Sequence, residues 1–361
     1  MSEPTARTID VLVVDDAVVV RRMLSDVLAS DPGLRVVATA ADGRIALQRI
    51  QQSPPDVVTL DIEMPELNGI ETLKAIRRTH PMLPVIMFSA MTERGAAQTL
   101  EALACGASDY VTKPSSASSP LEVRQRIREQ LIPKIKALYR EPAAGFRDRP
   151  REAAPALRSL LDHRAAEAVV IGVSTGGPNA LAALLPSLPA DLQAPILIVQ
   201  HMPPMFTRLL ADRLNGRSPL SVVEAQHGQL LTPGTVHIAP GDYHLGVERR
   251  GSSVITVLTQ GPPENSCRPA ADVLFRSASA VFEDRLLAVV LTGMGQDGLR
   301  GCEEVRRRGG HVLAQDQRSS VVWGMPGFVA DAGLADAVLP LSEMPGEIVR
   351  RCTLPRMGRR P

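Results

Sequence analysis

The chain has 361 residues, a length that favours two domains. Hydrophobic residues make up 44% of it and charged residues 22%, which is typical of a soluble globular protein. The 40 Lys and Arg residues balance 39 Asp and Glu residues. The resulting net charge of +1 argues against a function in which this protein binds nucleic acid or an anionic membrane through a basic surface.

Cysteine usage and the N-terminus bear on the expected location of the protein. The N-terminal segment MSEPTARTIDVLVVDD lacks an apolar stretch of signal-peptide length, and no apolar run approaches the ~18 residues of a membrane span. The cysteines show neither C-x-x-C spacing nor a zinc pattern, which suits a reducing cytosol; they are Cys105, Cys267, Cys302 and Cys352. We therefore expect a cytoplasmic protein without membrane insertion.

Short apolar runs alternate with helical patterns in the first part of the chain. The runs are Ile9–Val14, Leu34–Ala38, Val57–Leu60, Val85–Phe88 and Asp109–Val111. They are short and β-branched, as strands buried on both faces are, and the segments between them have apolar residues at helical spacing. The pattern predicts a five-stranded parallel sheet covered by helices. Its last helix is expected at Leu121–Leu138, with a kink or break at Pro133.

Polar residues follow four of these predicted strands. Asp15 and Asp16 end the first run, and Asp61 ends the third. Ser89 ends the fourth, and Lys113 follows the fifth. Because ligands of an open α/β sheet bind outside the carboxyl ends of its strands, we expect these side chains to share one crevice. Converging carboxylates suit Mg²⁺, and the set predicts an Asp that accepts a phosphoryl group. The alternative is that Asp15 and Asp16 only end a strand and begin a turn.

The pattern DD … LDIEMPELNG … FSA … TKP resembles the receiver domain of two-component response regulators, over residues 8–138. The resemblance implies a flavodoxin-like domain that is phosphorylated on Asp61 with Mg²⁺ bound. It also implies metal binding by Asp15, Asp16, Asp61 and the backbone of Glu63, phosphoryl contacts from Ser89 and Lys113, and an aromatic switch at Tyr110.

Residues 139–166 are rich in Pro, Ala and alternating charge and predict a linker. The α/β pattern then resumes, with apolar runs at Ala168–Val173, Ile196–Val199, Val236–Ala239, Val254–Leu258, Leu286–Leu291 and His311–Ala314. These runs predict a second parallel-type sheet, with some antiparallel pairs around GTVHIAPGDYHLGVE.

Ser174 follows the first of these runs and precedes a Gly-rich turn and a helix that begins near Pro178. Local sequence leaves two interpretations open, a phosphate cradle at a helix N-terminus and a nucleophile on a sharp turn. His201 and Asp297 also follow buried strands. If the strands are parallel, all three side chains meet at one edge of the sheet, which favours a Ser–His–Asp catalytic unit.

The segments GVSTGGP, VQHMPPMFT, APGDYHL, CRPAADVLFRSA and LTGMGQDG resemble the catalytic domain of the chemotaxis methylesterase family (CheB). The resemblance covers residues 167–352 and implies a doubly wound α/β hydrolytic domain. It implies Ser174 as nucleophile, His201 as general base and Asp297 as the acid that orients His201. It places Thr175 beside the nucleophile and the backbone of Met294 in the oxyanion hole.

The same resemblance implies a phosphorylation-activated enzyme of chemotactic adaptation. Its substrates would be methyl-accepting chemotaxis receptors, on which it hydrolyses glutamyl methyl esters and deamidates specific glutamines. A chemotaxis histidine kinase would donate the phosphoryl group. Mg²⁺ is expected in the receiver and no cofactor for ester hydrolysis, and the unphosphorylated receiver is expected to cover the Ser174 crevice. A histidine base predicts activity that rises with pH at roughly 6–7.

Other interpretations remain at this point. The second half of the chain would be a binding module if GVSTGGP only held a partner or a nucleotide. A DNA-binding output is opposed by the near-zero net charge and by the second α/β pattern. Cys267 is a further candidate nucleophile, but no base adjoins it in the sequence.

Overall fold

The computed structural model describes residues 7–113, 119–139 and 165–353. The chain divides into two compact units at residue 142, and each unit is described by itself. The predicted linker, residues 139–166, lies almost wholly outside the described residues. Within the part of the chain that the structure describes, no helix is both long and apolar enough to cross a membrane.

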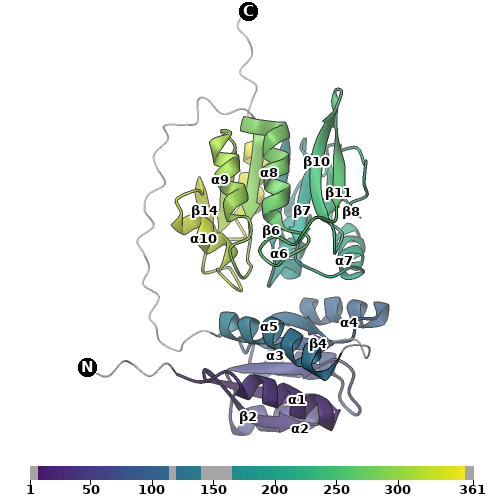
Figure 1. The fold of residues 1–361 in the computed structure, drawn as a ribbon, viewed down its shortest axis with the longest axis vertical. Coiled ribbons are helices and arrows are strands. Elements are labelled where there is room, and N and C mark those ends of the chain that lie inside the picture. The colour runs from purple at the N-terminus through teal and green to yellow at the C-terminus, as the bar shows by residue number, and fades with distance from the viewer. Residues whose placement is uncertain (1–6, 114–118, 140–164, 354–361) are drawn as a thin grey trace, which may run out of the picture. The chain divides into compact units, whose positions relative to one another are not determined.

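The N-terminal unit is a five-stranded parallel sheet with the strand order β2-β1-β3-β4-β5 (Figure 1). The strands are β1 (Ile9–Val14), β2 (Leu34–Ala40), β3 (Val57–Asp61), β4 (Val85–Ser89) and β5 (Asp109–Thr112). The helices are α1 (Val18–Ala29), α2 (Gly43–Gln52), α3 (Gly69–Thr79), α4 (Glu93–Ala104) and α5 (Pro120–Leu138). Strands β3, β4 and β5 are buried at every position because helices cover both faces, whereas the edge strand β2 alternates between buried and exposed residues.

Helix starts in this unit follow from local capping chemistry. Asn68 and Glu71 form a capping box at the start of α3, and Ser119 and Glu122 form another at the start of α5. Helix α5 continues through Pro133, so the predicted break at that residue does not occur. The two capping boxes satisfy backbone N–H groups at the starts of α3 and α5, whereas α1 begins without a side-chain cap.

The C-terminal unit contains a seven-stranded parallel sheet with the order β14-β13-β12-β6-β7-β9-β8, and a separate antiparallel hairpin of β10 and β11. The strands are β6 (Ala168–Val173), β7 (Ile196–Gln200), β8 (Ser221–Glu224), β9 (Thr235–Ile238), β10 (His244–Arg250), β11 (Ser253–Thr259), β12 (Leu286–Val290), β13 (His311–Gln315) and β14 (Ala337–Leu339). The helices are α6 (Gly177–Leu184), α7 (Phe206–Asn215), α8 (Ala271–Phe282), α9 (Leu299–Arg307), α10 (Met325–Asp331) and α11 (Met344–Thr353), with 3₁₀ turns η1 (Leu185–Ser187) and η2 (Glu283–Arg285).

The strand order reverses between β6 and its two neighbours. Strand β7, the next in the chain, pairs with one side of β6, and β12 pairs with the other. In open α/β sheets this reversal opens a crevice at the carboxyl ends of the strands, and ligands bind there. The loops after β6, β7 and β12 are the ones that carry Ser174, His201 and Asp297.

Two features of this unit differ from the sequence prediction. The run Val254–Leu258 was expected in the parallel sheet, but it lies in the β10–β11 hairpin. Strands β8 and β14 were not predicted. A short apolar run has the same pattern in a parallel sheet and in a hairpin, so periodicity could not separate the two. Strands β8 and β14 are short edge strands in which Val222 alone is buried, so their apolar signal is weak.

Helix α8 lies over the sheet of the C-terminal unit (Figure 1) and contributes five buried residues to its core. Phe275 on this helix is fully buried, and its ring lies against α9, where a Cβ at Gly301 would come within 2.5 Å of the Cβ of Phe275. Glycine at 301 therefore lets α9 approach α8 closely. The same helix begins at Ala271, beside the loop that carries Asp297, so core packing holds that loop in place.

The central role of α8 predicts that Phe275→Ala destabilises the C-terminal unit by about 3–5 kcal/mol, because it leaves a large cavity. Phe328→Ala is a matched control, since Phe328 is 49% exposed and should cost less than ~1 kcal/mol. Trp323 is the only tryptophan of the chain, so its fluorescence during urea unfolding reports on this unit. Equal unfolding midpoints for the two variants would contradict the prediction.

Candidate functional site

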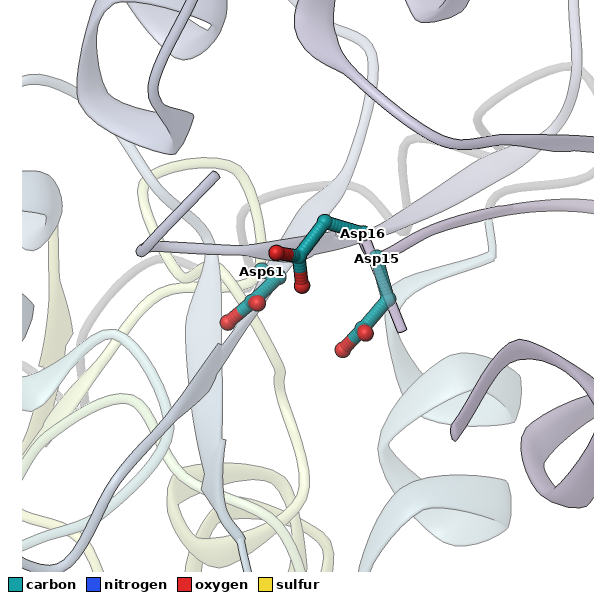
Figure 2. A group of neighbouring side chains, drawn as sticks. All are labelled: Asp15, Asp16 and Asp61. Atoms are coloured by element: carbon teal, nitrogen blue, oxygen red, sulfur yellow. The ribbon is translucent and has the colours of Figure 1, made fainter. Parts of the chain in front are cut away.

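The acidic cluster of the N-terminal unit lies at the ends of β1 and β3. Asp15 and Asp16 follow β1, and Asp61 is the last residue of β3. One oxygen of each carboxylate lies within 4.8 Å of the others, and Figure 2 shows the three groups gathered in one region. Asp15 and Asp61 are buried and Asp16 is exposed. Oxygen donors at this spacing, partly open to water, fit a hydrated Mg²⁺ ion.

Lys113 contributes the positive charge of this cluster. Its Nζ lies 2.8 Å from Oδ1 of Asp61 and 3.2 Å from Oδ2 of Asp15. Burial raises the pKa of Asp61 to about 6, and the hydrogen bond from Lys113 opposes that rise. Oδ2 of Asp15 is buried and accepts no well-aligned hydrogen bond from the described residues. One lysine thus offsets the carboxylates only in part, and a divalent cation fits the charge that remains.

The hydroxyl of Ser89 is turned towards helix α4. Its Oγ donates to the carbonyl of Gly95 at 3.1 Å and lies 2.6 Å from Oγ1 of Thr99. To contact a phosphoryl group on Asp61, Ser89 has to exchange these partners. The sequence predicted the position of Ser89 at a strand end, but it carried no information on the partners of its hydroxyl.

Tyr110 and Glu63, the two other predicted receiver residues, differ in burial: Tyr110 is buried and the side chain of Glu63 is exposed. Tyr110 on β5 is buried, and Nζ of Lys134 lies 5.3 Å from the centre of its ring. The side chain of Glu63 is exposed and pairs with Arg94 at 3.7 Å. Since this side chain is directed to Arg94, only the backbone of Glu63 remains as the predicted metal ligand, and that role stays a prediction.

Ser174 lies in the turn between β6 and α6 of the C-terminal unit. Its N–H donates to the carbonyl of Thr292 at 3.0 Å, and its own carbonyl accepts from Nε2 of Gln200 at 3.1 Å. The same amide of Gln200 lies 3.4 Å from the carbonyl of His201, so one buried side chain joins the two backbones. Gly177 leaves the space for it, because a Cβ there would lie 1.9 Å from Oε1 of Gln200.

His201 follows β7, and its Nε2 lies 2.7 Å from Oδ2 of Asp297. Asp297 is only 2% exposed, so burial opposes its charge. The hydrogen bonds from His201, Ala271 and Asp272 nevertheless hold the pKa of Asp297 below its usual value. Ala271 and Asp272 begin α8, and Gly298 caps α9, so the N–H groups of two helix N-termini converge on this carboxylate.

The other ring nitrogen of His201 faces a thiol. Nδ1 lies 3.7 Å from Sγ of Cys267, and no hydrogen bond from Oγ of Ser174 to the imidazole occurs among the described residues. The structure thus joins His201 to Asp297, and it adds Cys267 at the position where a nucleophile would contact the base. The sequence did not give Cys267 a base because His201 is 66 residues away in the chain.

These two neighbours favour the charged form of His201. Burial disfavours that charge, but the hydrogen bonds to Asp297 and Cys267 raise the pKa of His201 to about 10. This value is higher than the roughly 6–7 expected for an ordinary histidine base. A charged imidazole cannot accept a proton, so the predicted role of His201 as general base requires its neutral form.

The loop after β12 passes directly against Ser174. A Cβ at Gly293 would lie 2.9 Å from the Cβ of Ser174. Thr292 Oγ1 donates to the carbonyl of Thr175 at 2.9 Å, which fixes the residue beside Ser174. Met294 is the next residue of this loop, so its N–H remains the predicted donor to a developing oxyanion.

Comparison with known proteins agrees with this arrangement. The receiver-domain model of response regulators matches residues 11–125, and the CheB methylesterase model matches residues 169–348. A protein-glutamate methylesterase/protein-glutamine glutaminase from a Nocardioides species is 55% identical over 95% of both chains. A protein of the same name from Trichodesmium erythraeum is 50% identical over 94% of this chain and 98% of its own. The chain belongs to the CheB methylesterase family.

A solved structure of a CheB catalytic domain is also similar in fold to the C-terminal unit. The crystal structure of the Thermotoga maritima CheB methylesterase catalytic domain is 44% identical, with a TM-score of 0.51, and the match covers 52% of this chain and 99% of that one. The predicted family and the predicted fold class, a receiver domain followed by an α/β hydrolytic domain, are therefore confirmed. The roles of individual residues remain predictions.

The contact between Cys267 and His201 predicts a shifted pH profile. Cys267→Ala removes one of the two interactions that raise the pKa of His201, so the pKa should fall while the bond to Asp297 keeps it above that of free imidazole. A base works only when neutral, so kcat/KM on a chromogenic ester should rise at a lower pH in the variant than in the wild type. The test is kcat/KM from about pH 6 to 10, and superimposable profiles would contradict it.

Proposed function

We propose that this protein is a cytoplasmic, phosphorylation-activated protein-glutamate methylesterase that also acts as a protein-glutamine glutaminase on chemotaxis receptors. The observation that carries the proposal is the His201–Asp297 pair beside Ser174 at the strand-order reversal, in a chain whose relatives of that name match it almost end to end. The domain boundaries proposed for it are residues 8–138 for the receiver, 139–166 for the linker and 167–352 for the catalytic domain.

In the proposed reaction, Oγ of Ser174 attacks the carbonyl carbon of a glutamyl methyl ester, and His201 accepts the hydroxyl proton. Asp297 stabilises the imidazolium that forms, and the N–H of Met294 donates to the oxyanion. When the C–O bond to the methoxy group breaks, His201 returns the proton and methanol leaves. Water, deprotonated by His201, then attacks the acyl carbon. The bond to Oγ of Ser174 breaks, Oγ regains the proton from His201, and glutamate leaves. On a glutamine, the same steps release ammonia.

The contact of His201 with Cys267 sets a condition on this mechanism. Nδ1 of His201 cannot accept a proton from Ser174 while it faces the thiol at 3.7 Å. The imidazole therefore has to turn towards Ser174 when substrate binds. Nε2 of Gln200 contacts the carbonyls of both Ser174 and His201, which keeps the two backbones adjacent.

In the receiver, Asp15, Asp16 and the backbone of Glu63 would hold Mg²⁺ together with Asp61, which takes the phosphoryl group from a chemotaxis histidine kinase. When bound, the ion neutralises charge on the transferring phosphoryl oxygens. Lys113 already contacts Asp61 and can pair with the added phosphate, and Ser89 would turn from Gly95 towards it. We propose that this rearrangement raises the activity of the C-terminal unit.

The catalytic assignment predicts that Ser174→Ala lowers receptor demethylation by about 10⁴-fold or more, with His201→Ala similarly severe. Release of methanol from methylated receptor and mass spectrometry of its glutamates provide the measurement. Ser187→Ala is a matched control, because Ser187 is an exposed serine of the same unit. Retention of near wild-type activity by folded Ser174→Ala would show that another residue is the nucleophile.

The regulatory assignment predicts that a small phosphodonor with Mg²⁺ activates the wild-type chain but not Asp61→Asn. The amide cannot form an acyl phosphate, and it binds the cation less well than a carboxylate. Asp26→Asn, an exposed aspartate on α1, is the control and should respond as the wild type does. The measurement is the demethylation rate with and without donor. An Asp61→Asn variant that still responds would exclude Asp61 as the phosphoacceptor.

A further inference from the structure

A tight turn brings a second group of residues to the catalytic pair. Glu264 and Cys267 exchange backbone hydrogen bonds of 3.0 and 2.8 Å, and the two residues between them, Asn265 and Ser266, have φ values of 50° and 61°. Positive φ at both central positions is the geometry of a type I′ turn, which Asn tolerates well and Ser less well. The two central residues of the turn are exposed, but the side chain of Asn265 extends from it to buried carboxylates of the site.

The side chain of Asn265 bridges two buried carboxylates. Its Nδ2 donates to Oδ1 of Asp297 at 3.0 Å and to Oδ2 of Asp272 at 2.9 Å. Asp272 is 1% exposed and Asp297 is 2% exposed. Two adjacent carboxylates repel each other in a medium of low polarity, and a donor shared between them offsets part of that repulsion.

Asp272 connects the side chain of Asn265 to the start of helix α9. Its Oδ1 accepts from the N–H groups of Gly298 at 3.0 Å and Gly301 at 2.6 Å, at the start of α9. Burial and the neighbouring Asp297 raise the pKa of Asp272, which reflects the cost of placing two acids side by side. Asp272 therefore holds α9 and its preceding loop, while Asn265 links that anchor to the carboxylate that contacts His201.

We propose that Asn265 is a positioning residue for the reaction of Ser174 and His201. The amide of Asn265 joins the backbone N–H groups of Asp272 and Gly298 as donors to Oδ1 of Asp297. Oδ2 of the same carboxylate is then left to Nε2 of His201 and the N–H of Ala271. The proposal deepens the function proposed above and rests on it for the activity, but the orientation of His201 can be tested without any substrate.

The left-handed conformation of Asn265 determines the choice of variants. Asn265→Gly deletes the amide and keeps a residue that adopts positive φ without strain. Asn265→Asp keeps the shape and replaces the donor by a carboxyl group. Ser266→Gly is the control, because it changes the same turn and removes no hydrogen bond to Asp272 or Asp297. Circular dichroism of the full chain establishes that each variant is folded.

In Asn265→Gly, kcat for the methyl ester should fall about 10- to 100-fold with little change in KM, because the base is misaligned while the substrate surface is intact. The pKa of His201, followed by NMR of its imidazole and assigned with His201→Ala, should fall because its bond to Asp297 weakens. In Asn265→Asp, the ratio of variant to wild-type kcat should rise as the pH is lowered, because the new carboxyl donates only when protonated. Ser266→Gly should match the wild type in both measurements.

An Asn265→Gly variant with wild-type kcat and an unchanged His201 pKa would overturn the proposal, as would an Asn265→Asp ratio that does not vary with pH. If the wild-type chain hydrolyses no glutamyl ester, the proposed function fails. The NMR titration of His201 then still decides whether Asn265 positions Asp297, so the two failures are distinguishable.

Discussion

The candidate site of the C-terminal unit depends on keeping Asp297 ionised in the protein interior. An isolated carboxylate buried to this degree would take up a proton. Here the N–H groups at the starts of α8 and α9 point at it, and His201 and Asn265 complete its hydrogen bonds. Because the positive ends of two helices face one carboxylate, the helix dipoles and these N–H groups stabilise its negative charge. The same carboxylate accepts from Nε2 of His201, so the donors that hold Asp297 also hold the partner of the imidazole.

The same topological rule positions the candidate sites of both units. In the N-terminal sheet β1 lies between β2 and β3, and Asp15 and Asp61 follow β1 and β3. In the C-terminal sheet β6 lies between β7 and β12, and the loops after these three strands approach one another. Loops that leave neighbouring strands in opposite directions open a crevice, and buried strands hold its walls rigid. The sites proposed for phosphoryl transfer and for ester hydrolysis thus both lie in a crevice at the ends of parallel strands.

The sequence was sufficient for the fold and for the strand-end residues, because buried parallel strands appear as short apolar runs and their ends are visible as the first polar residues. Asp61 at the end of β3 and His201 just after β7 follow from that pattern alone. The pattern could not distinguish the β10–β11 hairpin from strands of the sheet. It also could not identify Asn265, whose role depends on a turn with two positive φ values and on two acids brought together only in the folded chain.

The surroundings of His201 were the largest departure from expectation. The sequence predicted a base between Ser174 and Asp297, but in the structure the imidazole lies between Asp297 and Cys267. The orientation of one imidazole ring separates these two arrangements, and no sequence pattern encodes it. The consequence is a site with two candidate nucleophiles, Ser174 and Cys267, of which the proposed mechanism uses the serine.

The identity of the residue that becomes acylated therefore tests the account most directly. A receptor peptide with a glutamyl methyl ester is mixed with the wild-type chain, the reaction is quenched in acid before steady state, and the protein is digested for mass spectrometry. The account predicts that the added glutamyl group is found as an ester on Ser174. A thioester on Cys267, with Ser174 unmodified, would contradict it.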